Sequence, residues 1–106
     1  MPKRGITIVD ETSSSGPPLK KGDRVRLRYS IQLNRGDYLV RDTEAVFTVG
    51  DRNVVAGFRY GLEGMHFGGT RRFKASPHLC YRDQELEHIP KNAVLIFDIM
   101  NVELLS

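Results

Sequence analysis

The segment from Val54 to Phe73 combines a helical apolar pattern with five glycines, and this combination restricts the fold more than any other feature of the chain. Phe58, Leu62 and Met65 recur at helical spacing and predict one apolar helix face. Glycines stand inside the same pattern at 57, 61 and 64, and each interior glycine costs a helix about 0.5–1 kcal/mol relative to alanine. We therefore expect a helix over roughly residues 56–65 that is held by packing, with glycines where its backbone closely approaches another element.

The clearest strand signal lies between Asp23 and Leu33, where apolar and polar residues alternate without a break. Period-two alternation predicts a strand with one buried and one solvated face. Residues 34–37 (Asn-Arg-Gly-Asp) then predict a hairpin turn. The segment 94–100 is apolar on both faces, which indicates a central strand, and its pattern slips near Asn101, which suggests a bulge. Further strands are expected at residues 5–9, 38–40, 45–49 and 70–75.

One helix cannot form a layer of its own, so its apolar face must lie against the strands. We therefore predict an α+β fold in which a bent antiparallel sheet of five or six strands wraps around one short helix. The 106 residues are expected to form a single domain, 1–106, with a strand and a flexible Ser/Pro loop in residues 1–19.

Composition narrows the setting in which we expect the protein to act. A single cysteine provides no internal disulfide, and Cys80 has no activating neighbour in the sequence, so we interpret it as a small apolar residue. The three histidines lack metal-ligand spacing with Cys80, so no metal site is expected. The first residues contain no apolar segment typical of a secretory signal, and no apolar run approaches a membrane span. We therefore expect a cytoplasmic protein with no membrane partner.

Cationic side chains gather on two predicted strands, as Arg24, Arg26 and Arg28 on one and as Arg71, Arg72 and Lys74 on the other. Alternating charge usually means only that an outer sheet face is solvated. The alternative is a docking surface for an acidic protein or for nucleic acid. The net charge of +3 is small, and no aromatic residues are interleaved with the arginines, as single-strand binders usually require. We favour the solvated face and do not expect a nucleic-acid partner.

A series of short motifs follows in order along most of the chain. It begins with Tyr29 in its strand, a turn at Gly36 and Gly50 at a strand end. The sequence V-V-A-G-F-x-x-G-L-E-G-M-x-x-G-G-x-R follows from residue 54, S-P-x-x-x-Y from residue 76, and I-P-x-N-A-V-L-I-F-D-I from residue 89. This series, from about Lys20 to Glu103, resembles the FKBP-type peptidyl-prolyl cis-trans isomerases.

The resemblance implies a shallow apolar pocket between the helix and the sheet. Phe58 would form the pocket floor, where the family often has tryptophan. Val55 matches the position whose backbone N–H bonds the ligand, and Tyr81 matches a hydroxyl that bonds a ligand carbonyl. The residues at the family's catalytic positions are Tyr29, Phe58, Tyr81 and Phe97, and those at its substrate-binding positions are Leu39, Val54, Val55 and Ile89.

Such a pocket can speed rotation about the bond before proline without a cofactor. The barrier, about 18–20 kcal/mol, arises because resonance gives the C–N bond double-bond character. Water stabilises the charge-separated resonance form, so removing water from the amide favours the twisted state. The resemblance therefore implies a monomeric peptidyl-prolyl cis-trans isomerase that acts on Xaa-Pro bonds in proline-containing peptides or unfolded proteins, with macrolide ligands as further candidates.

The sequence departs from the family pattern at several pocket positions, including the loop before Pro90, where Glu85 or Leu86 stands in place of the usual histidine. Leu39 and Val40 stand where the family usually has Phe-Asp, and Ala45 stands where it has another aromatic residue. Asp42 could replace the missing aspartate only through a register shift of two residues. These departures leave an alternative open: an FKBP-fold protein-binding module with weak or no isomerase activity.

Overall fold

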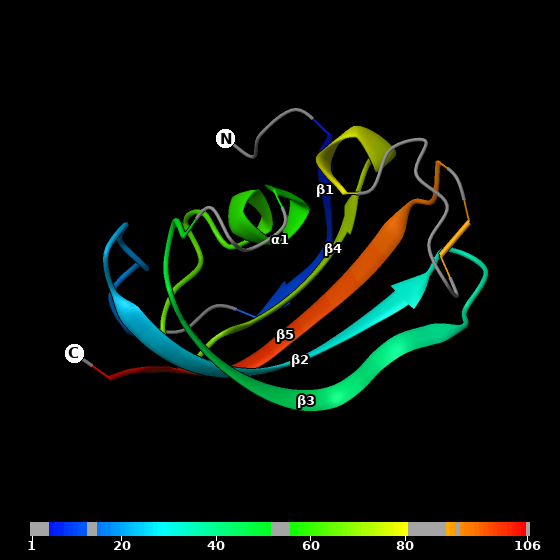
Figure 1. Ribbon diagram of the computed structural model, residues 1–106. Helices are drawn as coiled ribbons and strands as arrows, with labels where there is room; N and C mark the ends of the chain where they lie inside the picture. The colour runs from blue at the N-terminus through cyan, green and yellow to red at the C-terminus, as the bar shows by residue number, and fades with distance from the viewer. Residues whose placement is uncertain (1–4, 13–14, 52–55, 81–88, 91, 106) are drawn as a thin grey trace.

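The structure is a computed structural model that describes residues 5–12, 15–51, 56–80, 89–90 and 92–105 (Figure 1). Its elements, in chain order, are β1 (Ile6–Thr12), β2 (Arg24–Leu33), β3 (Tyr38–Thr48), α1 (Ala56–Gly61), β4 (Thr70–Ala75), the 3₁₀ turn η1 (Pro77–Leu79) and β5 (Leu95–Leu104).

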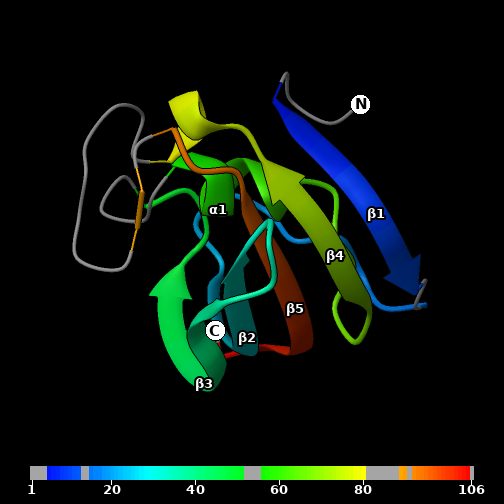
Figure 2. The ribbon, with the colours of Figure 1, turned by 90° about the vertical axis from the view of Figure 1, so that its right-hand side faces the viewer.

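The five strands form one antiparallel sheet in the order β1-β4-β5-β2-β3. Figures 1 and 2 show this sheet curving around α1, which lies across its concave face. We refer to the opposite side of the sheet as the convex face. The predicted fold, a bent antiparallel sheet around one short helix, is confirmed, and β5 is central as expected. The bulge expected near Asn101 is also present, because φ is 54° there and the pairing of β5 with β2 shifts between Met100 and Glu103.

The strands predicted at residues 38–40 and 45–49 are a single strand of 11 residues, β3, and the prediction of two separate strands was wrong. The polar run at residues 41–44 interrupts the apolar pattern but not the backbone pairing with β2. An irregularity around Asp42, whose φ is 46°, takes up the shift in register between Tyr29 and Ile31. Because β3 is an edge strand, it can carry polar residues in its middle without burying them.

The helix is shorter than predicted, since α1 ends at Gly61 and a turn carries the chain on to Met65. The expected apolar face is present, with Phe58, Leu62 and Met65 at most 5% exposed. Gly61 explains the close packing, because a Cβ at this position would lie 2.0 Å from the ring of Phe73 on β4. Gly57 is similar, with its added Cβ 2.9 Å from that of Ala75. Within the described residues, no helix has the length and apolar character needed to cross a membrane.

The sequence predicted that Arg71 on β4 lies on the outer face with its cationic neighbours, and this prediction was wrong. Alternation along β4 places it on the concave side with Phe73, where it is 6% exposed. Its guanidinium donates hydrogen bonds of 2.8 and 2.7 Å to the carbonyl oxygens of Gly61 and Glu63, and pairs with the carboxylate of Glu11 on β1. Arg71 thereby satisfies carbonyl groups that the end of a helix leaves without partners, and it ties the edge strand to α1.

Two cations near the middle of the convex face lie close to carboxylates on neighbouring strands. Arg26 of β2 lies 3.0 Å from Glu44 of β3 and 3.5 Å from Glu103 of β5. Arg72 of β4 lies 3.7 Å from Asp98 of β5. These carboxylates offset positive charge that would otherwise attract nucleic acid or an acidic protein. The geometry therefore favours a solvated outer face over a docking surface.

Candidate active site

Four aromatic side chains from four elements meet between α1 and the sheet. Phe58, in the first turn of α1, has its ring centroid 5.3 Å from that of Tyr29 on β2 and 5.5 Å from that of Phe97 on β5. The ring centroid of Phe47 on β3 lies 5.4 Å from that of Phe58, and all three contacts with Phe58 are edge-to-face. Edge-to-face pairs at this distance each contribute about 0.5–1.5 kcal/mol beyond burial. Phe58 is thus held in place by rings from three strands.

Exposure increases from the inside of this cluster to its rim. Phe97 is fully buried and stacks on Phe73 at 5.0 Å, and Phe58 is 5% exposed. Tyr29 and Phe47 are only partly buried, so part of their surface lies toward solvent. The cluster therefore has a fixed apolar floor and a more open edge, which is the arrangement needed to take an apolar group out of water.

The structure brings together three of the residues proposed for the site from sequence, Tyr29, Phe58 and Phe97. Leu39 packs against the core from β3, and Ile89 is partly buried, but neither contributes a ring to the cluster. Three further predicted site residues lie outside the described residues: Val54, Val55 and Tyr81.

Comparison with known proteins identifies the family and supports the fold. The family model for the FKBP-type peptidyl-prolyl cis-trans isomerase matches residues 16–102. The chain belongs to the FKBP family. The crystal structure of AtFKBP13 has a similar fold, with a TM-score of 0.81 and 27% identity over 93% of this chain and 92% of that one. FkpA from Escherichia coli shares the fold at a TM-score of 0.75 and 23% identity, over 98% of this chain and 54% of the other.

Curated FKBP relatives cover nearly all of this chain. "FK506-binding protein 4" of Chaetomium thermophilum is 40% identical over 104 residues, which are 95% of this chain and 22% of the relative. A "Peptidyl-prolyl cis-trans isomerase" of Saccharomyces cerevisiae is 36% identical over 103 residues, 94% of this chain and 25% of the relative. The chain thus spans about a quarter of the length of these relatives. The resemblance drawn from the sequence motifs is confirmed for the family and its fold.

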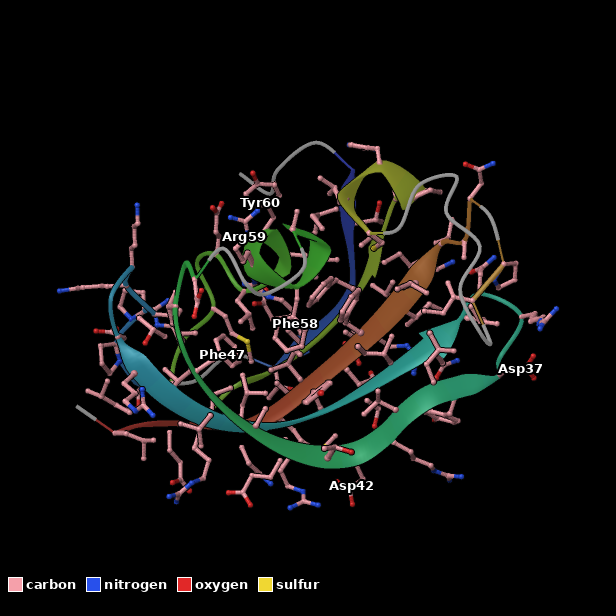
Figure 3. All side chains as sticks on the ribbon, in the orientation of Figure 1. Asp37, Asp42, Phe47, Phe58, Arg59 and Tyr60 are labelled. Atoms are coloured by element: carbon pink, nitrogen blue, oxygen red, sulfur yellow. The ribbon has the colours of Figure 1, made fainter. Side chains whose placement is uncertain are left out.

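Phe47 is the member of the aromatic cluster that sequence reasoning missed. It pairs with Val25 across the β2–β3 ladder, and Ala45 pairs with Leu27, so both lie on the concave face of this FKBP fold. Figure 3 shows Phe47 on the same side of the sheet as Phe58. The sequence signal that could have identified Phe47 is its spacing of two residues from Ala45. In a strand this spacing places the Phe47 ring on the same face as Ala45, where the family's aromatic residue is missing.

Asp42 does not stand in for the family's aspartate. Figure 3 shows its side chain leaving β3 on the convex side, away from α1. Arg28 donates from Nε to Oδ1 of Asp42 at 2.9 Å and from a terminal nitrogen to the backbone oxygen of Asp42 at 2.8 Å. The backbone N–H of Asp42 donates to Ser30 Oγ. The hydrogen bond and charge of Arg28 lower the pKa of the Asp42 carboxyl. Asp42 therefore stays ionised on the outer face and gives no charge to the pocket.

Cys80, just after η1, has the properties of a partly buried, packed thiol rather than a nucleophile. Its Sγ would lie 3.1 Å from a Cβ added at Gly57, so it packs beside α1. Burial raises the pKa of the thiol to about 11. At neutral pH it is protonated and thus a weak nucleophile.

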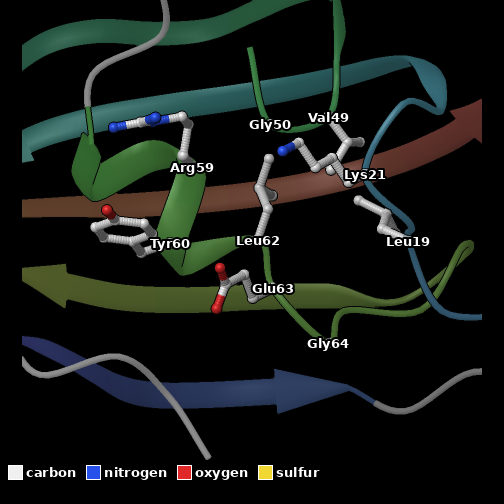
Figure 4. A pocket seen from close by; sticks show the side chains of 9 residues that line it. All are labelled: Leu19, Lys21, Val49, Gly50, Arg59, Tyr60, Leu62, Glu63 and Gly64. Carbon is white, nitrogen blue, oxygen red and sulfur yellow. The ribbon is translucent and has the colours of Figure 1, made fainter. Parts of the chain in front are cut away.

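A separate hollow of about 330 Å³ opens beside α1, away from the aromatic cluster (Figure 4). No sequence motif pointed to this hollow. Three stretches of chain line it: the turn before β2, the end of β3 and the end of α1. The lining residues are Leu19, Lys21, Val49, Gly50, Arg59, Tyr60, Leu62, Glu63 and Gly64.

Proposed function

We propose that this chain is a peptidyl-prolyl cis-trans isomerase that acts on Xaa-Pro bonds of flexible or unfolded polypeptides. The observation that carries the proposal is the ring cluster around Phe58, in a chain that belongs to the FKBP family. Phe58, supported from below by the buried Phe97, supplies the floor of the proline pocket, and the partly exposed rings of Tyr29 and Phe47 supply its edge. The names of the curated relatives, which include an isomerase and FK506-binding proteins, support the same activity and make macrolides candidate ligands.

The proposed mechanism needs only the removal of water from the amide that rotates. The ring edges around Phe58 accept the apolar pyrrolidine ring of proline and bring the preceding amide against an apolar surface. Because the planar amide carries more charge separation than the twisted one, it loses more solvation there, and the barrier falls. Each 1.36 kcal/mol by which the barrier falls gives a tenfold acceleration. In this proposal Val55 contributes a backbone N–H and Tyr81 a hydroxyl to hold the substrate.

Exchange NMR on a short Xaa-Pro peptide tests the activity directly. We expect the wild-type chain to speed cis–trans exchange, and Tyr29→Leu to slow catalysis about tenfold through the loss of a ring contact worth roughly 1.4 kcal/mol. Tyr38→Leu is the matched control, because Tyr38 is 47% exposed on β3 and makes its ring contact with Arg41 instead. Circular dichroism of each variant shows whether it is folded. Equal losses in both variants would contradict the proposed pocket.

A protein-binding module is the second candidate, and two observations favour it. Ala45 leaves the concave face without an aromatic ring at one pocket position, and Asp42 is held on the convex face by Arg28. Both make the pocket more open and less polar than the family pattern. A folded wild-type chain that binds proline peptides in NMR titrations, but leaves their exchange rates unchanged, would establish this function in place of catalysis.

A further inference from the structure

The hollow beside α1 is built from segments that backbone hydrogen bonds hold together. The N–H of Leu19 donates to the carbonyl of Met65 at 2.8 Å, and the N–H of Val49 donates to the carbonyl of Asp23 at 2.8 Å. Lys21 lies across Gly50, since a Cβ at Gly50 would come within 2.9 Å of Lys21 Cγ. The walls are therefore fixed relative to one another before any ligand arrives.

Charged groups in the hollow lack the ion pairs found elsewhere in the molecule. Within the described part of the chain, the side chains of Lys21, Arg59 and Glu63 make no salt bridge. Arg59 lies over the ring of Tyr60 at 5.3 Å, yet its Nε is buried with no hydrogen-bond partner among the described residues. A buried donor without a partner costs free energy, and such groups are rare in folded proteins. This nitrogen is not accessible from the hollow, so it is the charges of Lys21 and Arg59, both lining residues, that favour a ligand.

The distribution of these groups favours an anionic ligand with an apolar stem. Figure 4 shows the Lys21 ammonium beside Gly50, the Arg59 guanidinium directed away from Gly50 on the side of Tyr60, and Glu63 on the far side of Leu62. The lining contains two cations and one carboxylate, so it has a net positive charge. Leu19, Val49 and Leu62 add apolar surface. The side chain of a glutamate or aspartate residue, with its methylene stem and carboxylate end, fits this combination.

We propose that the hollow binds an acidic side chain of the same polypeptide whose proline occupies the aromatic pocket. This inference rests on the proposed isomerase function and names the class of substrate it prefers. Phe58 and Arg59 are consecutive in α1, so their side chains leave the helix about 100° apart. One residue therefore serves the proline pocket and the next serves the hollow.

The geometry of α1 limits the spacing between proline and acid. A helix with its side chains is about 10–12 Å across, and an extended chain advances about 3.3–3.6 Å per residue. A peptide that passes over α1 therefore reaches from the pocket to the hollow in roughly three or four residues. Substrates with an acidic residue at that distance from proline bind better than substrates without one.

The test compares matched peptides that carry Glu or Gln three or four residues from proline, on either side of it. Exchange NMR over a range of peptide concentrations gives KM for each peptide. We expect the Glu peptide to have the lower KM at one of these spacings, by about three- to fivefold for each ion pair formed. This advantage should decrease in Lys21→Met and Arg59→Met and should weaken as salt is added.

Two further variants separate a specific site from general electrostatics. Lys20→Met removes the same charge from the neighbouring residue, which does not line the hollow, and should keep the wild-type ratio of the two KM values. Glu63→Gln removes the opposing carboxylate and should increase the advantage of the Glu peptide, an effect that loss of structure would not produce.

The possible outcomes distinguish the two proposals. Equal KM values for Glu and Gln peptides at every spacing, with catalysis present, would overturn the acidic site and leave the isomerase intact. An advantage that Lys20→Met and Lys21→Met reduce equally would also overturn it. If neither peptide is isomerised, the proposed function fails, and the dissociation constants of the same peptides from NMR titration decide whether the hollow prefers the acid.

Discussion

The two faces of the sheet use charge in opposite ways, and neighbouring residues of β4 show the difference. Arg72 lies on the convex face, partly exposed, 3.7 Å from Asp98. Arg71 lies on the concave face, 6% exposed, with two carbonyl oxygens and the Glu11 carboxylate around its guanidinium. An exposed pair gains little because water already solvates both ions, whereas a buried cation must keep all its partners. One substitution at each position therefore measures the contrast.

The largest expected effect is that of Arg71→Met. It leaves the carbonyl groups of Gly61 and Glu63 without their donor and Glu11 without its cation, so we expect a loss of about 3 kcal/mol in the free energy of unfolding. Arg72→Met should cost no more than about 0.5 kcal/mol. Urea denaturation of both variants checks this difference. Similar losses in the two variants would show that the faces do not differ in the way the contacts indicate.

A second pair of neighbours tests the faces through apolar side chains. Phe47 on the concave face contacts the Phe58 ring at 5.4 Å, while Val46 is 44% exposed. We expect Phe47→Ala to lower the free energy of unfolding by about 2 kcal/mol, less than for a fully buried phenylalanine, and to slow isomerisation because Phe58 loses a support. Val46→Ala should change stability by less than about 0.5 kcal/mol.

The exchange assay and urea denaturation together check the Phe47 prediction. A Phe47→Ala variant with reduced stability but unchanged catalysis per folded molecule would place this ring in the core alone. Loss of both would make it part of the pocket, and would sharpen the comparison between the two faces of β3.

The same contrast explains which parts of the structure could be predicted from sequence. The alternation in β2 and the two apolar faces of β5 are local patterns, and they predicted a strand and its central place. Glycines 57, 61 and 64 were all expected to allow close packing. Gly57 and Gly61 do, whereas the prediction for Gly64 was wrong, because a Cβ there would meet open space and its φ of 76° serves the turn after α1 instead. Arg71 was assigned to the wrong face, because a cation in a strand usually lies in water and its buried partners come from distant parts of the chain.

The ring contacts of Phe47 and the hollow beside α1 were beyond prediction from sequence for a related reason. The side of the sheet on which β3 places each residue depends on the irregularity at Asp42, which the interrupted apolar pattern concealed. The hollow is lined by three stretches of chain, around Lys21, Gly50 and Arg59, that lie close only after folding. Neither feature leaves a periodic signal, so only the tertiary structure reveals it.

The smallest expected effect is the loss of stability when the Asp42–Arg28 pair is broken. The direction of the pKa shift of Asp42 determines how this loss changes with pH. The hydrogen bond from Arg28 and its charge lower the pKa of Asp42 in the folded state. A carboxyl with a lowered folded pKa stabilises the protein above its unfolded pKa, near 4, and loses this contribution as pH falls through the folded pKa. We therefore expect Asp42→Asn to be slightly less stable than wild type at neutral pH, and the difference to disappear in acid. Because the pair is exposed, added salt should reduce the difference as well. Urea denaturation across this pH range checks the prediction, and a difference that grows in acid would mean that Arg28 does not hold this carboxylate in solution.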